Sequence, residues 1–491
     1  MLDRRTLVKL GALTGAGLLI PPAVTSRAGQ AAPPPPHHVH GGHGLGPQPA
    51  FVGSALAATP FSVPLPLPST LRPTASLFDT DFYLLRHRRA RVELIPGTTT
   101  EIFGYGGSYV GPTIRARTGR RVVIAHVNEL DMPTSVHLHG GHVPASSDGH
   151  PMDLISPGAT KLYHYPNHQQ SATLWYHDHA HHMEAEHVYR GLHGFYLLED
   201  PREAALRLPS GAQDVPIMLT DAQFAEDGSL IWVQNDFRNR NQVLVNGRPQ
   251  PYLRVAARRY RLRLLNAANL RSFALSLSTG EQLTQIASDS GLLPAPAAVG
   301  AVALSPGERA EVVVDFSAYP VGTKLQLVDS VAGELLRFEV GSAPRVDASR
   351  VPDTLRPLAP LPTADTVRQV RLGLDFASGT FQIDGKTFDP DRVDATIKRG
   401  TSEIWEITNT DTQLGIPHNL HLHLVHFRVL SRDGNPPGPG ESGSKDTVNV
   451  NPGEVVRVQA TFGDYTGRYV YHCHLLDHSA VGMMAQMEIV A

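Results

Sequence analysis

The sequence predicts an all-β protein built from repeated sandwich or barrel units. Short runs rich in Val, Ile, Leu and Tyr alternate with turn signals, as at residues 121–125, 260–265, 310–314 and 455–458, which is typical of such folds. Two similar turns, Ser305-Pro306-Gly307-Glu308 and Asn451-Pro452-Gly453-Glu454, each precede one of these runs, and this indicates repetition. At 491 residues the chain is long enough for about three domains.

The composition is that of an ordinary globular protein. Hydrophobic residues make up 41% and charged residues 18%, with a mean hydropathy of -0.17. The formal net charge of -3 and the pI near 6.8 provide no broad basic surface for phosphates, so nucleic acid is not an expected partner. Small molecules are expected instead.

The first 32 residues have the pattern of an export signal. Arg4 and Arg5 precede a short, weakly apolar run at 10–20, followed by small residues at 28–32. The paired arginines predict a twin-arginine-type signal for export to the periplasm, the cell surface or the medium. An ordinary secretory signal is the alternative. The run is shorter than the roughly 20 residues that span a bilayer, so we expect no membrane anchor in the mature chain.

Composition also divides the remaining chain. Residues 33–68 are rich in Pro, Gly and His and are predicted to be a linker, with no role assigned to their histidines. A second Pro-rich linker covers 351–364, and a weaker boundary follows Glu199-Asp200-Pro201. The predicted domains are therefore 69–203, 204–350 and 365–491. Asn246-Gly247 and Asp384-Gly385 are predicted hairpin turns.

Histidines recur in four pairs with one residue between the two members. The pairs are His137-Leu138-His139, His177-Asp178-His179, His421-Leu422-His423 and His472-Cys473-His474. On a strand, residues i and i+2 share a face, so both imidazoles of a pair can reach one metal region. One such pair is weak evidence for a metal, but four pairs predict that eight imidazoles converge on a cluster.

The fourth pair encloses Cys473, the only cysteine of the chain. The thiolate faces away from its two histidine neighbours, so two metal sites share one tripeptide. His418, His478 and Met483 complete a Cys, two-His and Met set, which is expected for a blue-copper electron-transfer site. Zinc prefers a closed tetrahedral site. Met484 is the alternative axial ligand, and only spacing favours Met483.

At this point the sequence resembles the multicopper oxidases. The four copper-binding segments occur in the order of that family, and residues 173–180 and 421–425 look most like the bacterial spore-coat laccase, bilirubin oxidase and phenoxazinone synthase branch. The resemblance covers roughly residues 70–491. It implies three consecutive cupredoxin-like Greek-key domains, with type 1 copper in the third, a trinuclear cluster between the first and third, and a mainly structural second domain.

The resemblance also implies a role for each ligand. Type 1 copper falls to His418, Cys473, His478 and Met483, with electrons entering there through Cys473. Type 2 copper falls to His137 and His421, and the type 3 pair to His139, His177, His179, His423, His472 and His474. Four copper ions would then couple four one-electron oxidations to the reduction of one dioxygen to two waters, with the protein setting geometry, potential and access.

Three further positions bear on this chemistry. Asp148 matches the family's acid near the trinuclear centre and is expected to supply protons, although Ser146-Ser147-Asp148-Gly149 is also a turn signature. Asn419 stands where the family usually has proline after the type 1 histidine. Ser479 stands where related bacterial enzymes often have a glutamate, so a carboxylate linked to proton delivery is missing there.

Histidines near the copper segments that match no ligand position are expected to pack or support the ligands. They are His142, His150, His164, His168, His181, His182, His187, His193 and His426.

Three functions compete for this ligand set. The first is a laccase-like oxidase of phenols, aminophenols or bilirubin-like pigments. The second is a Cu(I) or Mn(II) oxidase, which the scarcity of methionine, with only eight in the chain, disfavours. The third is a copper-storage or coat protein, which would not need two sites sharing one tripeptide. A two-domain copper nitrite reductase is also disfavoured, because that class of protein does not contain the four histidine pairs together.

Overall fold

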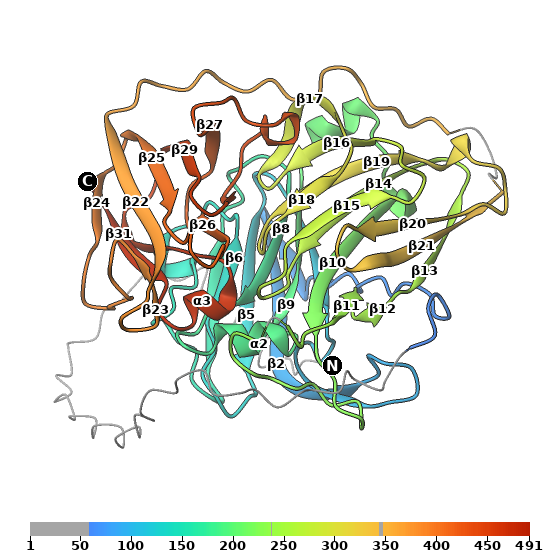
Figure 1. The fold of residues 1–491 in the computed structure, drawn as a ribbon, viewed down its shortest axis with the longest axis horizontal. Helices are drawn as coiled ribbons and strands as arrows, with labels where there is room; N and C mark the ends of the chain where they lie inside the picture. The colour runs from blue at the N-terminus through green and yellow to red at the C-terminus, as the bar shows by residue number, and fades with distance from the viewer. Residues whose placement is uncertain (1–57, 237, 343–346) are drawn as a thin grey trace. The chain divides into compact units, whose positions relative to one another are not determined.

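The structure is a computed structural model that describes residues 58–236, 238–342 and 347–491. The predicted export signal and most of the first predicted linker lie outside the described residues. Within them, six sheets group in three pairs along the chain (Figure 1). The predicted all-β class is confirmed.

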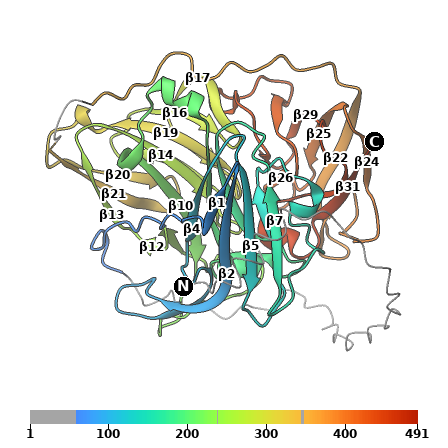
Figure 2. The ribbon, with the colours of Figure 1, turned by 180° about the vertical axis from the view of Figure 1, so that it is seen from behind.

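The first sandwich is formed by a five-stranded and a four-stranded sheet. The five-stranded sheet, seen from behind in Figure 2, contains β1 (Ala75–Leu77), β2 (Thr80–Val92), β5 (Arg121–Asn128) and β7 (Thr160–Tyr165), with β3 (Thr100–Tyr105) paired to β2. The other sheet has the order β4 (Gly111–Arg117), β9 (His193–Glu199), β8 (Ala172–Asp178) and β6 (Val136–His139). Leu85 and Tyr163 from one sheet pack on Leu174 and Tyr196 from the other.

The second sandwich has the same two-layer construction. Its seven-stranded sheet runs β12 (Arg248–Pro249), β11 (Gln242–Val245), β10 (Asp214–Ala222), β14 (Arg259–Asn266), β19 (Arg309–Asp315), β16 (Leu283–Ser288) and β17 (Gly291–Val299). Its other sheet runs β13 (Tyr252–Ala256), β21 (Gly333–Gly341), β20 (Lys324–Asp329), β15 (Phe273–Leu277) and β18 (Val302–Leu304). Alternation along β14 explains its position: Leu262 and Leu264 enter the core, whereas Arg261 and Arg263 point to the opposite face.

The third sandwich consists of two five-stranded sheets. The first runs β23 (Thr380–Ile383), β22 (Thr366–Asp375), β25 (Ser402–Asn409), β29 (Val455–Thr461) and β27 (Phe427–Arg432). The second runs β24 (Ala395–Lys398), β31 (Met484–Val490), β30 (Gly467–His472), β26 (His418–Leu422) and β28 (Thr447–Val450). Trp405 and Val458 from the first sheet share a core with Leu420 and Tyr469 from the second.

Matching turns and crossovers show the repetition directly. Glu308 accepts a hydrogen bond from the backbone of Ser305 at 2.6 Å, and Glu454 accepts one from the backbone of Asn451 at 2.7 Å. These two turns lead into β19 and β29, as the sequence predicts. Each sandwich also contains two parallel strand pairs, namely β2 with β5 and β4 with β9, β10 with β14 and β13 with β21, and β22 with β25 and β24 with β31.

The two predicted hairpin turns are present. Asn246 and Gly247 have φ values of 48° and 82° between β11 and β12, and Asp384 and Gly385 have values of 54° and 73° after β23. Positive φ at both central residues is what a two-residue hairpin requires.

Short helices and coil segments complete the described chain. The helices are α2 (Glu184–Tyr189) and α3 (Leu476–Ser479), with 3₁₀ turns at Ala145–Ser147, Pro201–Leu206, Gly211–Gln213, Phe316–Ala318 and Pro439–Glu441. At the end of the predicted first linker, the backbone NH groups of Phe61 and Leu65 donate to Gln250 and Tyr252 of the second sandwich. None of the helices in the described residues is long and apolar enough to cross a membrane.

Candidate metal centre

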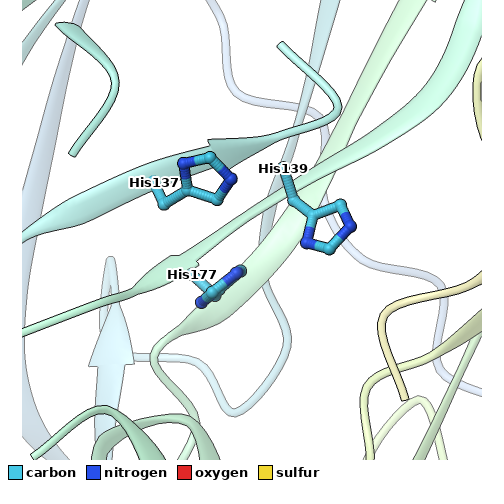
Figure 3. A group of neighbouring side chains, drawn as sticks. All are labelled: His137, His139 and His177. Atoms are coloured by element: carbon cyan, nitrogen blue, oxygen red, sulfur yellow. The ribbon is translucent and has the colours of Figure 1, made fainter. Parts of the chain in front are cut away.

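The four histidine pairs lie at the ends of four strands. The first pair is inside β6, but the others begin on β8, β26 and β30 and extend beyond them, so that His179, His423, Cys473 and His474 follow the last strand residue. Strand alternation alone therefore does not orient these pairs. Figure 3 shows His137 and His139 on one strand and His177 on its neighbour.

Strand register places histidines directly opposite one another. His137 is the Cα partner of His177 in the first sandwich, and His421 is the partner of His472 in the third. The histidines of the first sandwich meet those of the third. The ring centroids of His137 and His423 are 3.6 Å apart, and those of His139 and His421 are 3.8 Å apart, with the rings stacked in both pairs. All eight imidazoles thus gather between the first and third sandwiches.

Nitrogen atoms face each other within this group. The Nε2 atoms of His137 and His421 are 3.3 Å apart, and the Nε2 atom of His472 lies 3.2 Å from that of His179 and 3.3 Å from that of His423. Two nitrogens that bind one ion at about 2 Å each must lie within about 4 Å of each other. These pairs satisfy that condition.

The remaining histidines form a second group of three. Ring centroids of His139, His177 and His474 are 5.8, 4.7 and 5.3 Å apart. The trio His179, His423 and His472 has matching separations of 5.1, 4.9 and 5.4 Å. The nitrogen atoms of His179, His423 and His472 all lie within 4.8 Å of one another, whereas the His139, His177 and His474 group is defined by its ring separations.

In most of the eight rings, a hydrogen bond fixes which nitrogen is free. The Nδ1 atoms of His137, His177, His421 and His472 donate to the backbone carbonyls of Asp148, Asp178, Asp446 and Cys473 at 2.7 to 3.0 Å. Their Nε2 atoms remain available. His139 has the reverse orientation, because its Nε2 donates to the Asp446 carboxylate at 3.0 Å and Nδ1 remains free.

Burial keeps these rings neutral. It lowers the pKa of all eight imidazoles, to about 3 for His177 and about 4 for His472. Metal ligation requires the neutral ring, so the cluster is already in its binding form at neutral pH.

Unsatisfied nitrogens indicate that the residues fit metal ions. Among the described residues, no hydrogen-bond partner reaches the buried His139 Nδ1, His177 Nε2, His179 Nδ1 or either nitrogen of His474. Buried polar atoms are rarely left unpaired. Imidazole nitrogens suit copper, and these histidine groups, together with the cysteine site, are consistent with four copper ions.

A second site lies on the other side of the His472-Cys473-His474 segment. The Cys473 Sγ atom is 3.7 Å from Nδ1 of both His418 and His478, and all three side chains are buried. The Phe381 ring stacks on His478 at 3.8 Å. His478 retains 5% exposure whereas His418 has none, so His478 is the side of this site nearest to solvent.

Met483 and Met484 differ in their surroundings. Met483 shares the hydrophobic core of Cys473, and its carbonyl accepts the backbone NH of Cys473 at 3.1 Å. Met484 is the strand partner of His472 and is not part of that core. Met483, rather than Met484, therefore shares the surroundings of Cys473.

Asp148, which the family resemblance places near the cluster, contacts two of its histidines. Its Oδ2 accepts a hydrogen bond from His423 Nδ1 at 2.7 Å, and its backbone carbonyl accepts one from His137. Burial raises the pKa of Asp148 well above its ordinary value. The turn and the cluster contact coexist, because Ser147 ends a 3₁₀ turn and Gly149 has a φ of 77°.

Three polar residues that sequence reasoning missed hold the ligands in place. Asp446 contacts His139 and His421 and forms a fully buried ion pair with Arg309, at 2.6 Å between NH2 and Oδ2. Asp411 accepts from His418 Nε2 at 2.6 Å. Local sequence gives no signal for these contacts, except that Arg309 follows the Ser305–Glu308 turn. The second sandwich therefore contributes directly to the site.

Asn419 joins the two sites. Its Oδ1 accepts the backbone NH of His474 at 2.5 Å and lies 3.6 Å from Cys473 Sγ, while its Nδ2 donates to Ser305 Oγ and the Pro306 carbonyl. The departure from proline thus introduces a side chain that connects the third sandwich to the second.

The histidines without predicted ligand positions make ordinary hydrogen bonds where contacts are described. His142 contacts the Leu424 carbonyl, His182 that of Ala480, His193 that of Val188 and His426 that of Gly140. His150 contacts Gln486 and His187 contacts Asp178. Among the described residues, none of them belongs to a ligand group.

Comparison with known proteins agrees with this geometry. Two multicopper oxidase family models match residues 87–203 and 360–491. The chain is 34% identical to a laccase of Bacillus subtilis (strain 168), over 87% of this chain and 97% of the laccase. It is 38% identical to a bilirubin oxidase of Albifimbria verrucaria, over 87% of this chain and 80% of that enzyme.

The fold of a solved laccase is also similar. The crystal structure of a laccase from Pediococcus acidilactici matches with a TM-score of 0.84 and 31% identity, covering 89% of this chain and 95% of that one. Sequence, fold and ligand geometry therefore agree. The chain belongs to the multicopper oxidase family and is a copper-dependent oxidoreductase that uses oxygen as electron acceptor.

Proposed function

We propose that this laccase-like oxidase acts on small phenolic, aminophenolic or bilirubin-like molecules and reduces dioxygen to two waters. The observation that carries the proposal is the joining of two sites by one tripeptide, with Cys473 in one site and His472 and His474 in the other. The names of the laccase and bilirubin oxidase relatives support organic substrates.

The geometry supports the following ligands. His418, Cys473, His478 and Met483 would hold type 1 copper, and His137 and His421 would hold type 2 copper. The trios His139, His177, His474 and His179, His423, His472 would each hold one ion of the type 3 pair. Bound copper accepts electrons singly and delivers them to dioxygen.

The protein's own residues control access and proton movement. His478 would meet the reducing substrate, because it is the more exposed ligand of the cysteine site. Cys473 is covalently continuous with both flanking histidines, which provides a short through-bond connection. Asp148 orients His423 and is proposed to supply protons to oxygen as it is reduced.

Oxygen uptake by the copper-loaded protein, supplied with a dimethoxyphenol, tests this function. Hydrogen peroxide is assayed in parallel, and Cys473→Ser serves as a variant of similar size. We expect uptake without peroxide in the wild type, and loss of both uptake and blue colour in the variant.

Two results would redirect the proposal. No uptake with organic reductants but uptake with Cu(I) or Mn(II) would identify a metal-ion oxidase. A fully loaded blue protein that consumes no oxygen with either class would identify a storage protein.

We also propose the predicted domain limits and the export route. Each pair of sheets falls within 69–203, 204–350 or 365–491, which supports those limits. For export, residues 1–32 are fused to a reporter that is active only after export in folded form. Replacing Arg4 and Arg5 by lysine should abolish its activity, whereas unchanged activity would favour an ordinary secretory signal.

A further inference from the structure

Glu184 is a buried acid that has no part in the copper ligation or the proton supply proposed so far. It is the first residue of α2 and lies five positions after His179. Its side chain has 0% exposure, and neither carboxylate oxygen has a hydrogen-bond partner among the described residues. Burying a polar group without a partner costs about 1–3 kcal/mol on protein scales. An acid at this position therefore requires an explanation beyond stability.

The segments around Glu184 carry ligands of both proposed copper sites. α2 packs on α3, with Ala185 and Val188 against Leu476 and Ala480. On α3, which also carries His478, the Ser479 hydroxyl lies close enough to Glu184 to lower its pKa. That hydroxyl donates to the Leu476 carbonyl at 3.1 Å, so it does not satisfy the carboxylate.

Asp178 is the charged neighbour on the side of the histidine cluster. It stands between His177 and His179 in the chain, and its carboxylate accepts the backbone NH groups of Ser135 and Ala180 and the His187 ring at 2.9 to 3.0 Å. The negative charge of Asp178 favours the protonated form of Glu184.

Burial is the main reason that Glu184 holds a proton. Burial raises its pKa to about 8, and Asp178 adds to the effect. The acid is therefore largely protonated at neutral pH and can give up a proton without a large change in pH, which is the property of an effective general acid.

The segment just before α2 is exposed to solvent at one residue. His182 is exposed, and its Nδ1 donates to the Ala480 carbonyl at 2.8 Å, next to Ser479. Glu184 is therefore two residues from an exposed position of its own segment, and His177 and His179 precede it in the same segment.

We propose that Glu184 is a proton-relay residue, which supplies from α2 the carboxyl that Ser479 does not supply from α3. The inference rests on the oxygen-reducing function proposed above. Reduction of one dioxygen to two waters consumes four electrons, taken from the reducing substrate, and four protons. In each transfer the Glu184 O–H bond breaks, the proton moves toward the oxygen under reduction, and the carboxylate takes up a proton from solvent at the α2–α3 contact.

The test separates electron entry from oxygen reduction in the copper-loaded enzyme. Bleaching of the blue band by a dimethoxyphenol without oxygen reports electron entry, and its recovery after oxygen is added reports oxygen reduction. For Glu184→Gln we expect unchanged bleaching and recovery slowed about 100-fold, the lower end of a general-acid contribution. The solvent deuterium isotope effect on recovery should increase.

Two further variants provide the control and the rescue. Glu186→Gln changes another acid of α2, which is 39% exposed and paired with Arg190, and it should behave like the wild type. Glu184→Gln combined with Ser479→Glu returns a carboxyl to the same contact from α3, and it should recover at least about a tenth of the wild-type rate.

A second readout does not depend on turnover. The pKa of Glu184 is raised from 4.5 to about 8 in the folded protein, so ionisation of this acid lowers the free energy of unfolding. This loss of stability is absent below pH 4.5, grows between pH 4.5 and pH 8, and is complete above pH 8. The melting temperature of Glu184→Gln relative to wild type should therefore rise from pH 5 to pH 9. The other acids and histidines on α2 and on the elements packed against it, α3, β8 and β10, are the same in both proteins, and they are Glu186, His187, Asp477, His478, His177, Asp178, Asp214 and Asp221.

Several outcomes would overturn the relay. They are recovery of Glu184→Gln at the wild-type rate, equal slowing of bleaching and recovery, and failure of Ser479→Glu to rescue. A copper-loaded wild type that takes up no oxygen would instead contradict the proposed function and remove the basis of the relay.

Discussion

Asn419 contacts residues of both copper sites. It stands where the family usually has proline, and its contacts show what the asparagine side chain does there. The negative end of its amide lies 3.6 Å from Cys473 Sγ, and the same oxygen accepts the His474 NH. A negative dipole beside the thiolate favours the more positive, oxidised copper. Asn419 is therefore expected to lower the type 1 potential while fixing the Cys473–His474 backbone.

Replacing Asn419 by alanine should raise the type 1 potential. If the interaction is worth about 1 kcal/mol, the rise is roughly 40 mV for one electron, measured by redox titration of the blue band. Asn449→Ala is the matched control, because Asn449 is the strand partner of Asn419 but its side chain donates to Asn451, away from Cys473. A lower potential in Asn419→Ala, or an equal change in the control, would contradict this account.

Asp446 has a different role, because it orients ligands through an ion pair. Burial opposes its ionisation, but Arg309 outweighs burial and holds the pKa of Asp446 below its ordinary value. Its contribution to stability is therefore complete above pH 3.8 and is lost as the pH falls through the folded-state pKa.

Asp446→Asn removes the nearer of the two buried carboxylates that face Arg309, at 2.6 Å, and leaves only Asp289, at 3.9 Å. We expect a loss of about 3–5 kcal/mol in unfolding free energy at neutral pH, and copper affinity about 10–100-fold weaker. Denaturant unfolding and metal analysis after dialysis check the two effects. Asp464→Asn, at an acid with 73% exposure, should change neither. Full copper retention in Asp446→Asn would exclude the orienting role.

At the scale of elements, the site depends on how strands end. β8, β26 and β30 each end within their histidine pair, and the Ser305–Glu308 turn before β19 packs against two of the cluster histidines, His139 and His474. Gly307 has a φ of 87°, and a Cβ placed there would lie 2.9 Å from the His474 ring and 3.0 Å from the His139 ring. Only glycine lets this turn approach the two rings so closely.

Gly307→Ala should therefore displace ligands as well as strain the backbone. Gly322→Ala is the control, since Gly322 has a φ of 91° and open space around its Cβ position. Both variants should lose about 1–2 kcal/mol from the left-handed backbone, but only Gly307→Ala should lose copper and alter the electron paramagnetic resonance of the type 2 site. Identical copper content in the two variants would contradict the close-approach argument.

At the scale of the whole molecule, buried charges connect the second sandwich to the strand that carries His177. Glu311 accepts hydrogen bonds from Arg261, Arg263 and Thr173, and Thr173 belongs to β8. All four side chains are buried. The second sandwich therefore supports the first through a satisfied network, and breaking this network should weaken their association.

Glu311→Gln should destabilise the protein by about 3–5 kcal/mol, because two buried arginines lose their shared carboxylate. The blue band should be unchanged below the unfolding transition, since the cysteine site is in the third sandwich. Glu101→Gln removes an exposed partner of Arg89 and should change stability by less than about 1 kcal/mol. Denaturation midpoints of the two variants measure the loss of stability. A smaller loss in Glu311→Gln than in Glu101→Gln would argue against the network.

The sequence determined the features that are local or repeated. Alternating apolar runs predicted the strands, paired turns predicted the repetition, and spacing identified the four histidine pairs and the neighbours of Cys473. These features could be predicted because periodicity and turn geometry act over a few residues. Resemblance to the multicopper oxidases added the order of the copper segments and the candidate acid at Asp148.

Only the tertiary structure decided how those features meet. It paired His137 with His177 and His421 with His472, brought Arg309 to Asp446, placed Asn419 against Ser305, and buried Glu184 at the start of α2. These partners are far apart in the chain, so no local pattern records their contact. Buried charges and polar groups are stabilised by whatever the fold brings within a few ångströms, and that is set by packing between sandwiches.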